Sequence, residues 1–428
     1  EGGFQPGLIY ELIYRTRICP VVGAGFLSVR DCVSFLRHAT EGNPVAGRID
    51  HCFGYGQSQT GRFLRHFLSC AMNVDEEGRR VFDGVMPHVA GARRGEFNHR
   101  YAQPSAQHAL SFGHLPPFHD LPQRDPLTGE GYPGLLDAQK HAGSVPKVFH
   151  TNTSSEYWRS EASLCHSDTG ATRDVDPGAD SRVYLLAGTE HGAGAVPPPA
   201  ADPKGARTAN PRNTVNYAPP LRALFLALEE WVVRGVEPPP SAIPRLADGS
   251  AAARQALLER FSRVPGAALI DPDELPALRR VDLGPRAAEG IATLPPRAGE
   301  RYPCFVAAVD DDFNEVAGIR LPDLTVPLGS HTGWNPRHPE ICGGNERALG
   351  QNVDMYGSTL PFPRTRAERE RRRDPRVSIE ERYASRDDYL AQVRSAARDL
   401  MRQRFLVEED VDLVLKHAAE RYDYFTSA

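Results

Sequence analysis

Residues 48–68, RIDHCFGYGQSQTGRFLRHFL, decide the fold class of this chain. The apolar run from Ile49 to Phe53 predicts a buried strand, and the apolar residues after Ser58 recur at helical spacing, which predicts a helix. Glycines between these elements predict a tight turn, and they are Gly54, Gly56 and Gly61. A strand, a glycine-rich turn with one serine, and a helix are typical of an α/β protein that presents a nucleophile at a strand end.

The composition is that of a globular protein of one or two domains. The chain has 428 residues, 40% of them hydrophobic, and a formal net charge of −5. We therefore expect a sizeable core and no nucleic-acid partner or anionic-membrane surface. No apolar run is long enough to be a transmembrane segment. The seven cysteines are scattered and form no CxxC pair, which argues against disulfides and structural zinc and slightly favours a cytoplasmic location.

Two later apolar runs are predicted strands that end in polar residues. Residues 145–158, VPKVFHTNTSSEYW, contain Glu156, and residues 181–192, SRVYLLAGTEHG, contain His191 on a glycine-rich loop. A serine hydroxyl needs a histidine to accept its proton and a carboxylate to orient that histidine. The chain order nucleophile, acid, histidine is that of α/β-hydrolases. The order therefore predicts a triad of Ser58, Glu156 and His191.

The residues leave alternatives open for each member of this triad. Thr60 occupies the second glycine position of a G-x-S-x-G pattern, so the turn around Ser58 also fits a purely structural glycine turn. Asp83 is a rival acid and His166 is a rival histidine. Neither reading requires a cofactor, and we expect no metal, because His108, His114, His119 and His141 lack metal-ligand spacing.

Several stretches of the chain resemble a bacterial family of alpha/beta-hydrolase domain proteins. They are GQSQTGRFLRHF, VFDGVMPHVAGARRGEFNHRYAQPS, VFHTNTSSEYWR, AGTEHG, APPLRALFLALEEWV, EVAGIRLPDLTVPLGSHTGWNPR and SRDDYLAQV. The resemblance covers nearly the whole chain. It implies an α/β-hydrolase fold and an esterase-like Ser-Glu-His hydrolase, with the family positions on Ser58, Glu156 and His191. The natural substrates of such proteins are mostly undefined.

The resemblance also implies a region upstream of this sequence. Family members usually carry a long segment before the stretch GGFQPGLIYEL, whereas this chain begins at Glu1. We expect that segment to supply the first strands of the sheet and the second oxyanion donor. The backbone N–H of Gln59, next to the serine, is the first oxyanion donor that we expect.

A second resemblance bears on the substrate. The S-x-x-G-[KR] pattern of Ser58, Gly61 and Arg62 is similar to that of glucuronoyl, tannase and feruloyl esterases, which prefer bulky polar, aromatic or sugar-acid esters. We therefore expect a small-molecule carboxylic ester as substrate and keep this group as the alternative class. A non-catalytic binding protein with the same fold is a further alternative, and an amide or lactone substrate is compatible with the same triad.

The chain divides into a predicted catalytic core over residues 1–235 and a mixed α+β extension over residues 236–428. Pro, Gly, His and Gln are abundant in residues 96–145, which we expect to be a lid-like insertion. Further predicted elements of the core are a strand over 8–16, a helix over 26–38, a strand over 81–92 and a helix over 221–235 closed by Gly235. In the extension we expect a hairpin around Asp310–Asp312 and a helix that starts at Ser385.

Five residues are candidates for substrate contact. Arg93 and Arg94 follow the strand over 81–92, and arginine binds carboxylates or sugar hydroxyls through a two-pronged fork, although a salt-bridged loop is the alternative. Tyr157 and Trp158 flank the predicted acid, where they either stack on substrate or pack in the core. Gln57 precedes the serine by one position. The sequence does not distinguish between oligomeric states.

Overall fold

A computed structural model describes residues 3, 17–18, 24–95, 110, 112–199, 205–287, 291–293, 295–342 and 348–427. Its strands are β1 (Phe53–Gln57), β2 (Gly84–His88), β3 (Gln123–Arg124), β4 (Gly131–Tyr132), β5 (Lys147–Thr153), β6 (Ser181–Leu186), β7 (Ala251–Ala252), β8 (Arg279–Asp282), β9 (Arg297–Arg301), β10 (Val306–Ala307), β11 (Gly329–Thr332) and β12 (Ser358–Pro361). Its α-helices are α1 (Ala24–His38), α2 (Gln59–Ser69), α3 (Asp137–His141), α4 (Ser154–Arg159), α5 (Ala218–Arg234), α6 (Arg254–Phe261), α7 (Pro322–Thr325), α8 (Arg366–Arg372), α9 (Ile379–Arg382), α10 (Arg386–Arg402) and α11 (Val411–Thr426).

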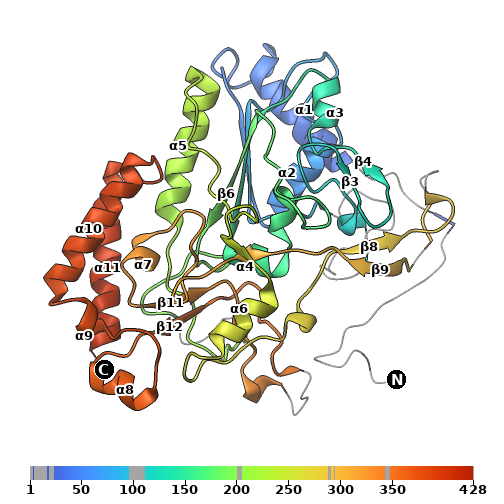
Figure 1. Ribbon diagram of the computed structural model, residues 1–428. Helices are drawn as coiled ribbons and strands as arrows, with labels where there is room; N and C mark the ends of the chain where they lie inside the picture. The colour runs from blue at the N-terminus through green and yellow to red at the C-terminus, as the bar shows by residue number, and fades with distance from the viewer. Residues whose placement is uncertain are drawn as a thin grey trace.

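A four-stranded parallel sheet of order β1-β2-β5-β6 forms the centre of the molecule (Figure 1). Gln57 lies opposite His88, His88 opposite Thr151, and Thr151 opposite Tyr184. This register brings the carboxyl ends of all four strands to one edge of the sheet. In open parallel sheets that edge is where ligands bind.

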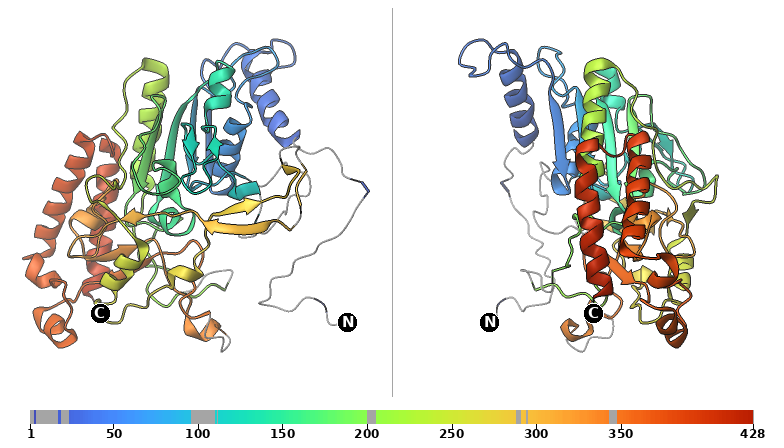
Figure 2. Two further views of the ribbon diagram at one scale, coloured as in Figure 1. Left: turned by 45° about the vertical axis from the view of Figure 1, so that its right-hand side comes forward. Right: turned by 90° about the vertical axis from the view of Figure 1, so that its left-hand side faces the viewer.

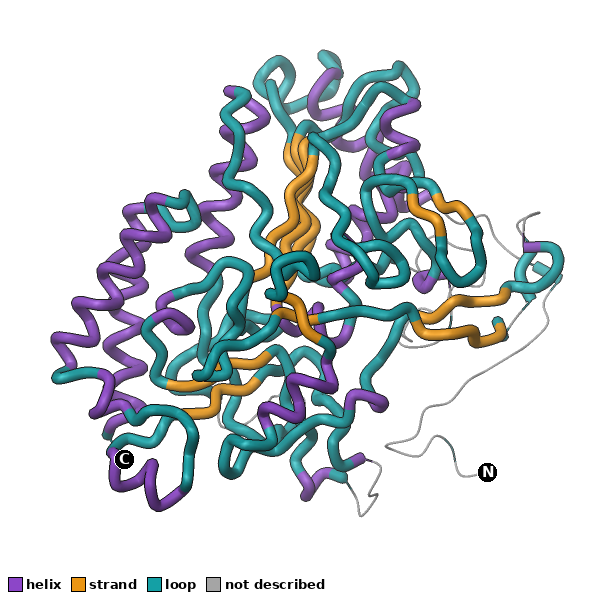
Figure 3. The backbone as a smooth tube through the Cα atoms, in the orientation of Figure 1, coloured by secondary structure: helices purple, strands orange, loops and turns teal. Residues whose placement is uncertain are grey.

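Helices cover both faces of this sheet, as Figure 3 shows. On one face α1 and α2 contribute Phe26 and Phe67 to a cluster with Val148 of β5. On the other face α5 contributes Trp231, whose ring lies 5.8 Å from that of Phe149. Because successive residues of a strand point to opposite faces, a strand buried on both sides must be apolar at consecutive positions. The α/β class with a parallel sheet, predicted from the sequence, is confirmed.

The region after α5 packs against the free side of β6. Ile319 accepts a hydrogen bond from Ala187 N at 3.1 Å and donates one to Leu185 O at 2.7 Å. One cluster of buried residues contains Leu186 of the sheet together with Ile319 and Val393. Helices α10 and α11 pack together as an outer layer (Figure 2). The division at residue 235 stays a prediction, and the two parts share this cluster.

The first strand of the sheet lies further along the chain than we expected. The apolar run predicted a strand over 49–53, but β1 begins at Phe53 and includes Gly54 and Gly56. Cys52 is instead held by Asp83 through two hydrogen bonds. The Asp83 N–H donates to Cys52 O at 2.8 Å, and the Cys52 N–H donates to Asp83 Oδ2 at 2.9 Å. In β1 the two glycines are the buried residues, and Phe53, Tyr55 and Gln57 are exposed, so a buried apolar run does not mark this strand.

The hairpin expected around Asp310–Asp312 forms only in part. The turn is present, because Asp310 Oδ1 accepts hydrogen bonds from Asp312 N and Asn314 N, both at 3.0 Å. Beyond it the two arms share a single antiparallel bridge, between Val309 and Glu315. β10 pairs with β7 instead.

Several predicted elements can be compared directly with the structure. The helix at 221–235 is α5, and Gly235 closes it in a left-handed conformation with φ 67°. Ser385 caps α10 by accepting a hydrogen bond from Asp388 N. The strand expected over 8–16 and residues 96–109 of the expected insertion lie outside the described residues.

The described part of the insertion is fixed to the central sheet. The carboxylate of Asp120 binds His150 Nε2 of β5 at 3.0 Å. Arg65 of α2 donates to Phe118 O at 2.6 Å and lies 3.1 Å from His150 Nδ1. These contacts join the insertion to both layers of the core.

In the described residues, none of the helices is long and apolar enough to cross a membrane.

Candidate active site

Ser58 lies on a strained turn between β1 and α2. Its backbone has φ 58° and ψ −115°, in a region that residues with a side chain rarely adopt. The Ser58 N–H donates to His88 O on the next strand at 2.9 Å, and Ser58 O accepts from Arg62 N of α2 at 2.9 Å. Strain of this kind persists only where the surroundings hold it in place, and it is concentrated at functional sites.

Two glycines make this turn sterically possible. A Cβ at Gly56 would lie 2.3 Å from Thr60 O, and a Cβ at Gly61 would lie 2.7 Å from His88 O. Both distances are well below contact distance. The G-x-S-x-G pattern would have its second glycine at position 60. In this chain the close approach to His88 O requires the glycine at position 61 instead.

The side chain of Thr60 closes the turn. Its hydroxyl accepts from Gln57 N and donates to Gln57 O, both at 2.8 Å. Gln59 is the first residue of α2 and is exposed. The first N–H groups of a helix have no partner within the helix, so they are available to an anion near Ser58.

Glu156 contacts His191 directly. Its Oε1 lies 2.6 Å from His191 Nδ1, and the carboxylate is fully buried. Its Oε2 accepts from the N–H and the hydroxyl of Thr153, which makes Glu156 the third residue of a capping box at the start of α4. Burial alone would raise the pKa of Glu156, but His191, Arg159 and the Thr153 hydroxyl outweigh burial and hold this pKa below its usual value.

His191 lies on the loop after β6 and is held by its backbone. Its N–H donates to Met355 O at 3.3 Å, and its C=O accepts from the Tyr217 hydroxyl at 2.7 Å. The Tyr217 hydroxyl also lies 3.3 Å from His88 Nε2. Since His88 O accepts from Ser58 N, a continuous chain of hydrogen bonds connects the serine turn with the histidine loop.

His88 is a member of this network that the sequence did not reveal. Burial lowers its pKa to about 4, so the ring is neutral at pH 7. With the Tyr217 hydroxyl donating to His191 O, the His88 Nε2–H donates to Tyr217, and its Nδ1 accepts from Thr151 Oγ1 at 2.9 Å. The one available signal was a polar residue near the end of the buried run over 81–92.

Ser58 and His191 are not hydrogen-bonded to each other in the described part of the chain, where the Nδ1 side of the histidine is occupied by Glu156. The serine turn follows β1 and the histidine loop follows β6, at the same edge of the sheet. Glu156 follows β5, between them in the strand order.

The rival acid and histidine lie in other surroundings. Asp83 precedes β2 at the amino end of the sheet, where it forms an ion pair with Arg37 at 2.9 Å. His166 is buried and its Nε2 lies 2.8 Å from the Tyr157 hydroxyl. Within the described residues, neither of them is hydrogen-bonded or ion-paired to Glu156, His191 or Ser58.

Two of the expected substrate contacts are core residues. Tyr157 is fully buried, and Trp158 is 2% exposed and packs edge-on against Trp334 at 6.0 Å. Of the two alternatives for these rings, stacking on a substrate or packing in the core, the structure shows packing in the core. The six-residue helix α4 is buried on all sides, so aromatic residues there pack rather than face solvent.

The other three expected contacts differ in exposure. Arg93 is buried and forms an ion pair with Glu161 at 3.5 Å, as in the salt-bridged alternative. Arg94 is half-buried and donates to Phe112 O at 3.4 Å. Gln57 is exposed at the end of β1, next to the serine turn. A substrate contact stays a prediction for these three residues.

Two buried carboxylates near the histidine were missed by the sequence analysis. Burial raises the pKa of Glu190, the neighbour of His191, to about 7, against a hydrogen bond from Gly357 N and the charge of Arg212. Burial also raises the pKa of Glu315 to about 7. Raised carboxyl pKa values mark groups that cost stability when ionised and are frequent near functional sites.

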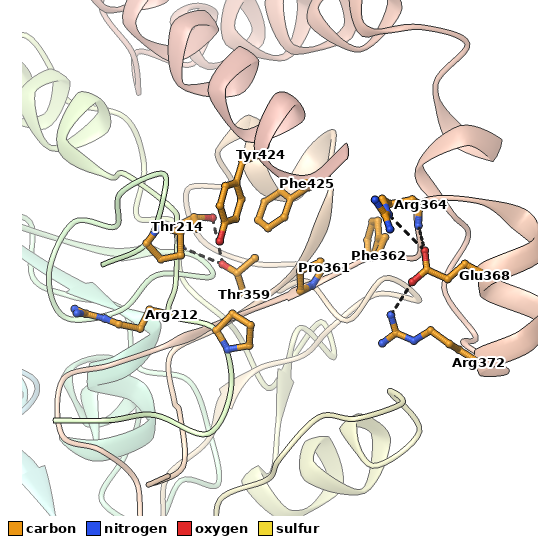
Figure 4. Close-up of a pocket in the computed structure, with 12 residues that line it drawn as sticks. Arg212, Thr214, Thr359, Pro361, Phe362, Arg364, Glu368, Arg372, Tyr424 and Phe425 are labelled. Carbon is orange, nitrogen blue, oxygen red and sulfur yellow. Dashed lines mark hydrogen bonds and ion pairs between the residues drawn. The ribbon is translucent and has the colours of Figure 1, made fainter. Parts of the chain in front are cut away.

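A cavity of about 320 Å³ lies beside the end of α11 (Figure 4). It is lined by Pro198, Pro211, Arg212, Thr214, Thr359, Pro361, Phe362, Arg364, Glu368, Arg372, Tyr424 and Phe425. Its lining contains none of Ser58, Glu156 and His191, and the guanidinium of Arg212 points away from its centre.

Within the described ranges, no three His, Cys, Asp or Glu side chains are grouped so that they could hold a metal ion.

Comparison with known families agrees with this architecture. A family model with the description "alpha/beta hydrolase domain" matches residues 13–416. The match includes the whole parallel sheet and most of the region after α5. No curated protein and no solved structure matches the sequence. Because the family model covers most of the chain, this protein belongs to the alpha/beta hydrolase domain family.

Proposed function

We propose that this protein is a serine hydrolase that cleaves carboxylic esters through an acyl-enzyme, with Ser58 as nucleophile, His191 as base and Glu156 as the orienting acid. The observation that carries the proposal is the 2.6 Å contact between Glu156 Oε1 and His191 Nδ1 at the sheet edge where Ser58 occupies a strained turn. A carboxylate on Nδ1 leaves Nε2 as the atom that accepts a proton from serine.

The first half of the reaction acylates the serine. His191 Nε2 accepts the proton of Ser58 Oγ as Oγ bonds to the carbonyl carbon of the ester, and the carbonyl oxygen becomes an oxyanion. The N–H of Gln59, at the start of α2, donates to that oxyanion. The tetrahedral intermediate collapses, the C–O bond to the alcohol breaks, and His191 returns the proton to the leaving alcohol.

The second half releases the acid. His191 accepts a proton from water, the hydroxide attacks the acyl carbon, and Ser58 leaves with the proton that His191 returns. Glu156 stabilises the imidazolium in both halves without taking a proton. The serine–histidine hydrogen bond forms with substrate bound, as catalytic hydrogen bonds in free enzymes are often long or poorly aligned.

The test is hydrolysis of p-nitrophenyl esters of increasing acyl length together with labelling by a fluorophosphonate. We expect Ser58→Ala to abolish both and His191→Ala to lower both strongly. Ser69→Ala, at the other end of α2, and His141→Ala, in α3, are matched controls that retain both.

The outcome separates the possible functions. Turnover that persists in Ser58→Ala contradicts the proposed nucleophile. A folded wild-type protein that neither turns over esters nor reacts with the fluorophosphonate supports the non-catalytic binding protein. Higher kcat/KM for feruloyl or sugar-acid esters than for simple alkyl esters assigns the substrate to the bulky polar class, which the pattern of Ser58, Gly61 and Arg62 favours.

A further inference from the structure

A carboxylate from the C-terminal region lies between the two loops that carry Glu156 and His191. We use the name acid loop for residues 153–156, which comprise the last residue of β5 and the first three residues of α4, and the name histidine loop for residues 187–191. Glu315 is 4% exposed, and its Oε2 accepts a hydrogen bond from Ser154 Oγ at 2.6 Å and one from Gly188 N at 2.8 Å. A single oxygen atom therefore joins the acid loop to the histidine loop.

Ser154 completes the connection between the loops. Its hydroxyl donates to Glu315 and accepts from Thr189 N at 3.2 Å. Ser155 N donates to Thr189 O at 3.3 Å. Ser154 precedes Glu156 by two residues, and Thr189 precedes His191 by two residues, so these bonds fix the backbone on both sides of the 2.6 Å acid–histidine contact.

Glu315 is itself held in place. It follows the turn built on Asp310 and pairs with Val309 across that turn. Four residues later, Ile319 joins the end of β6 through hydrogen bonds to Leu185 and Ala187. The carboxylate thus comes from a segment that is anchored on the same strand that ends in the histidine loop.

An ionised carboxylate at this position costs stability, and its two hydrogen bonds offset that cost. Burial raises the pKa of Glu315 to about 7, which means that the surroundings disfavour its ionised form. A leucine would fill the space without that cost, but it would accept neither hydrogen bond.

We propose that Glu315 is a positioning residue, which holds the acid loop and the histidine loop in the register that keeps Glu156 Oε1 against His191 Nδ1. The proposal rests on the proposed function for its consequence in catalysis, but the geometry that it describes exists without substrate. Small displacements of a general base have large effects on rate, since about 1 Å of misplacement costs about 100-fold.

The first experiment separates the hydrogen-bonding role of Glu315 from its charge. In Glu315→Gln the amide oxygen accepts both hydrogen bonds, and in Glu315→Leu neither bond forms. Ser154→Ala removes the bridge while leaving the carboxylate, and it serves if Glu315→Leu does not fold. The matched control is Asp323→Asn, which alters another buried carboxylate of the same region that pairs with Arg421 of α11 at 2.8 Å.

Two measurements are made on each folded full-length variant. The first is kcat and KM for a p-nitrophenyl ester. The second is the far-downfield proton resonance of the His191 Nδ1–H, assigned by its loss in His191→Ala. We expect Glu315→Leu and Ser154→Ala to lower kcat by about 10-fold or more with KM within about twofold, and Glu315→Gln to stay within about threefold of wild type. The proton signal shifts or broadens in the first two variants and is retained in Glu315→Gln and Asp323→Asn.

Two results overturn the positioning role. One is an unchanged kcat and proton signal in Glu315→Leu and Ser154→Ala. The other is a loss of kcat in Asp323→Asn as large as theirs, since the effect would then follow general stability. If the wild type shows the proton signal but no esterase activity, the proposed function fails while the response of the signal still decides the role of Glu315. A wild-type protein without the signal contradicts the acid–histidine pair and the positioning role together.

Discussion

The serine turn and the histidine loop lie at the same edge of the sheet, but they are built in different ways. The conformation of Ser58 depends on residues within four positions of it and on one hydrogen bond to His88. The position of His191 depends on Met355, Tyr217 and the Glu315 bridge, all distant in sequence. The turn that carries Ser58 is thus specified locally, and the contact between Glu156 and His191 is specified by the whole fold, which predicts different responses to substitution.

The largest effect is expected at the serine turn. In Gly56→Ala the new Cβ would meet the backbone of Thr60, which has no room to move within the turn. We expect a loss of at least about 3 kcal/mol in the free energy of unfolding and no fluorophosphonate labelling. Gly54→Ala on the same strand is the control, because its Cβ would lie at an ordinary 3.4 Å from Leu64. Equal stability of the two variants, by urea unfolding, would refute a sterically determined turn.

The next largest effect is expected at the acid. Glu156→Gln keeps a side chain of the same shape but removes the charge that orients and stabilises the His191 imidazolium. We expect kcat for p-nitrophenyl esters to fall by about 10²- to 10⁴-fold while the serine turn stays intact. Asp83→Asn, a change at the opposite end of the sheet, is the control for charge loss. If the two variants have the same kcat, Glu156 is not the acid of the triad.

A smaller effect is expected where the two regions meet. Tyr217→Phe removes the hydroxyl that donates to His191 O and lies next to His88 Nε2, and it leaves buried polar atoms without a partner. Such atoms cost about 1–3 kcal/mol. We expect the free energy of unfolding to fall by this amount and kcat to fall as well. An unchanged kcat in this variant would mean that the histidine loop does not depend on the connecting network.

The smallest effect, measured over one pH unit, is expected in the pH dependence of stability. Glu190 and Glu315 have folded-state pKa values of about 7, above the ordinary value of 4.5. Between these values the folded protein retains a proton that the unfolded chain has lost, so their stabilising contribution is full below pH 4.5 and declines as pH rises to about 7. Each group contributes up to about 1.4 kcal/mol per pH unit.

Removing one of these groups tests the sign of this effect. We expect Glu190→Gln to make the free energy of unfolding less dependent on pH between pH 5 and 7, and the double change with Glu315→Gln to reduce the dependence further. Urea unfolding at several pH values measures both. A steeper decline in the single variant would contradict a raised pKa for Glu190.

The same contrast explains what the sequence revealed. Periodicity and capping are local signals, so three features could be predicted from the sequence. They are the parallel α/β sheet, helix α5 with its closing Gly235, and the capped start of α10. The pairing of Glu156 with His191 followed from chain order and a strand before each residue. The identity of these residues as catalytic groups stays a prediction until the variants are measured.

The remainder could not be read from one sequence for physical reasons. Glu315 lies 161 positions from Ser154, and only the folded chain brings them together. Trp158 lies two positions after Glu156, and only the folded chain brings it edge-on against Trp334 of a distant segment. The hairpin at Asp310 was misjudged because β10 finds its partner in β7, more than fifty residues earlier. Long-range packing overrides local pattern in all three cases.

The presence of threonine instead of glycine at position 60 has a consequence for the unfolded chain. A glycine at this position would add backbone freedom to the unfolded state, and folding would have to remove it. Threonine reduces that freedom, and replacing glycine by a residue with a side chain at an unstrained position is worth about 0.4–1 kcal/mol. Thr60 adds two hydrogen bonds to the folded turn as well. The residue that departs from the usual glycine pattern thus offsets part of the conformational strain at Ser58, its neighbour two positions earlier.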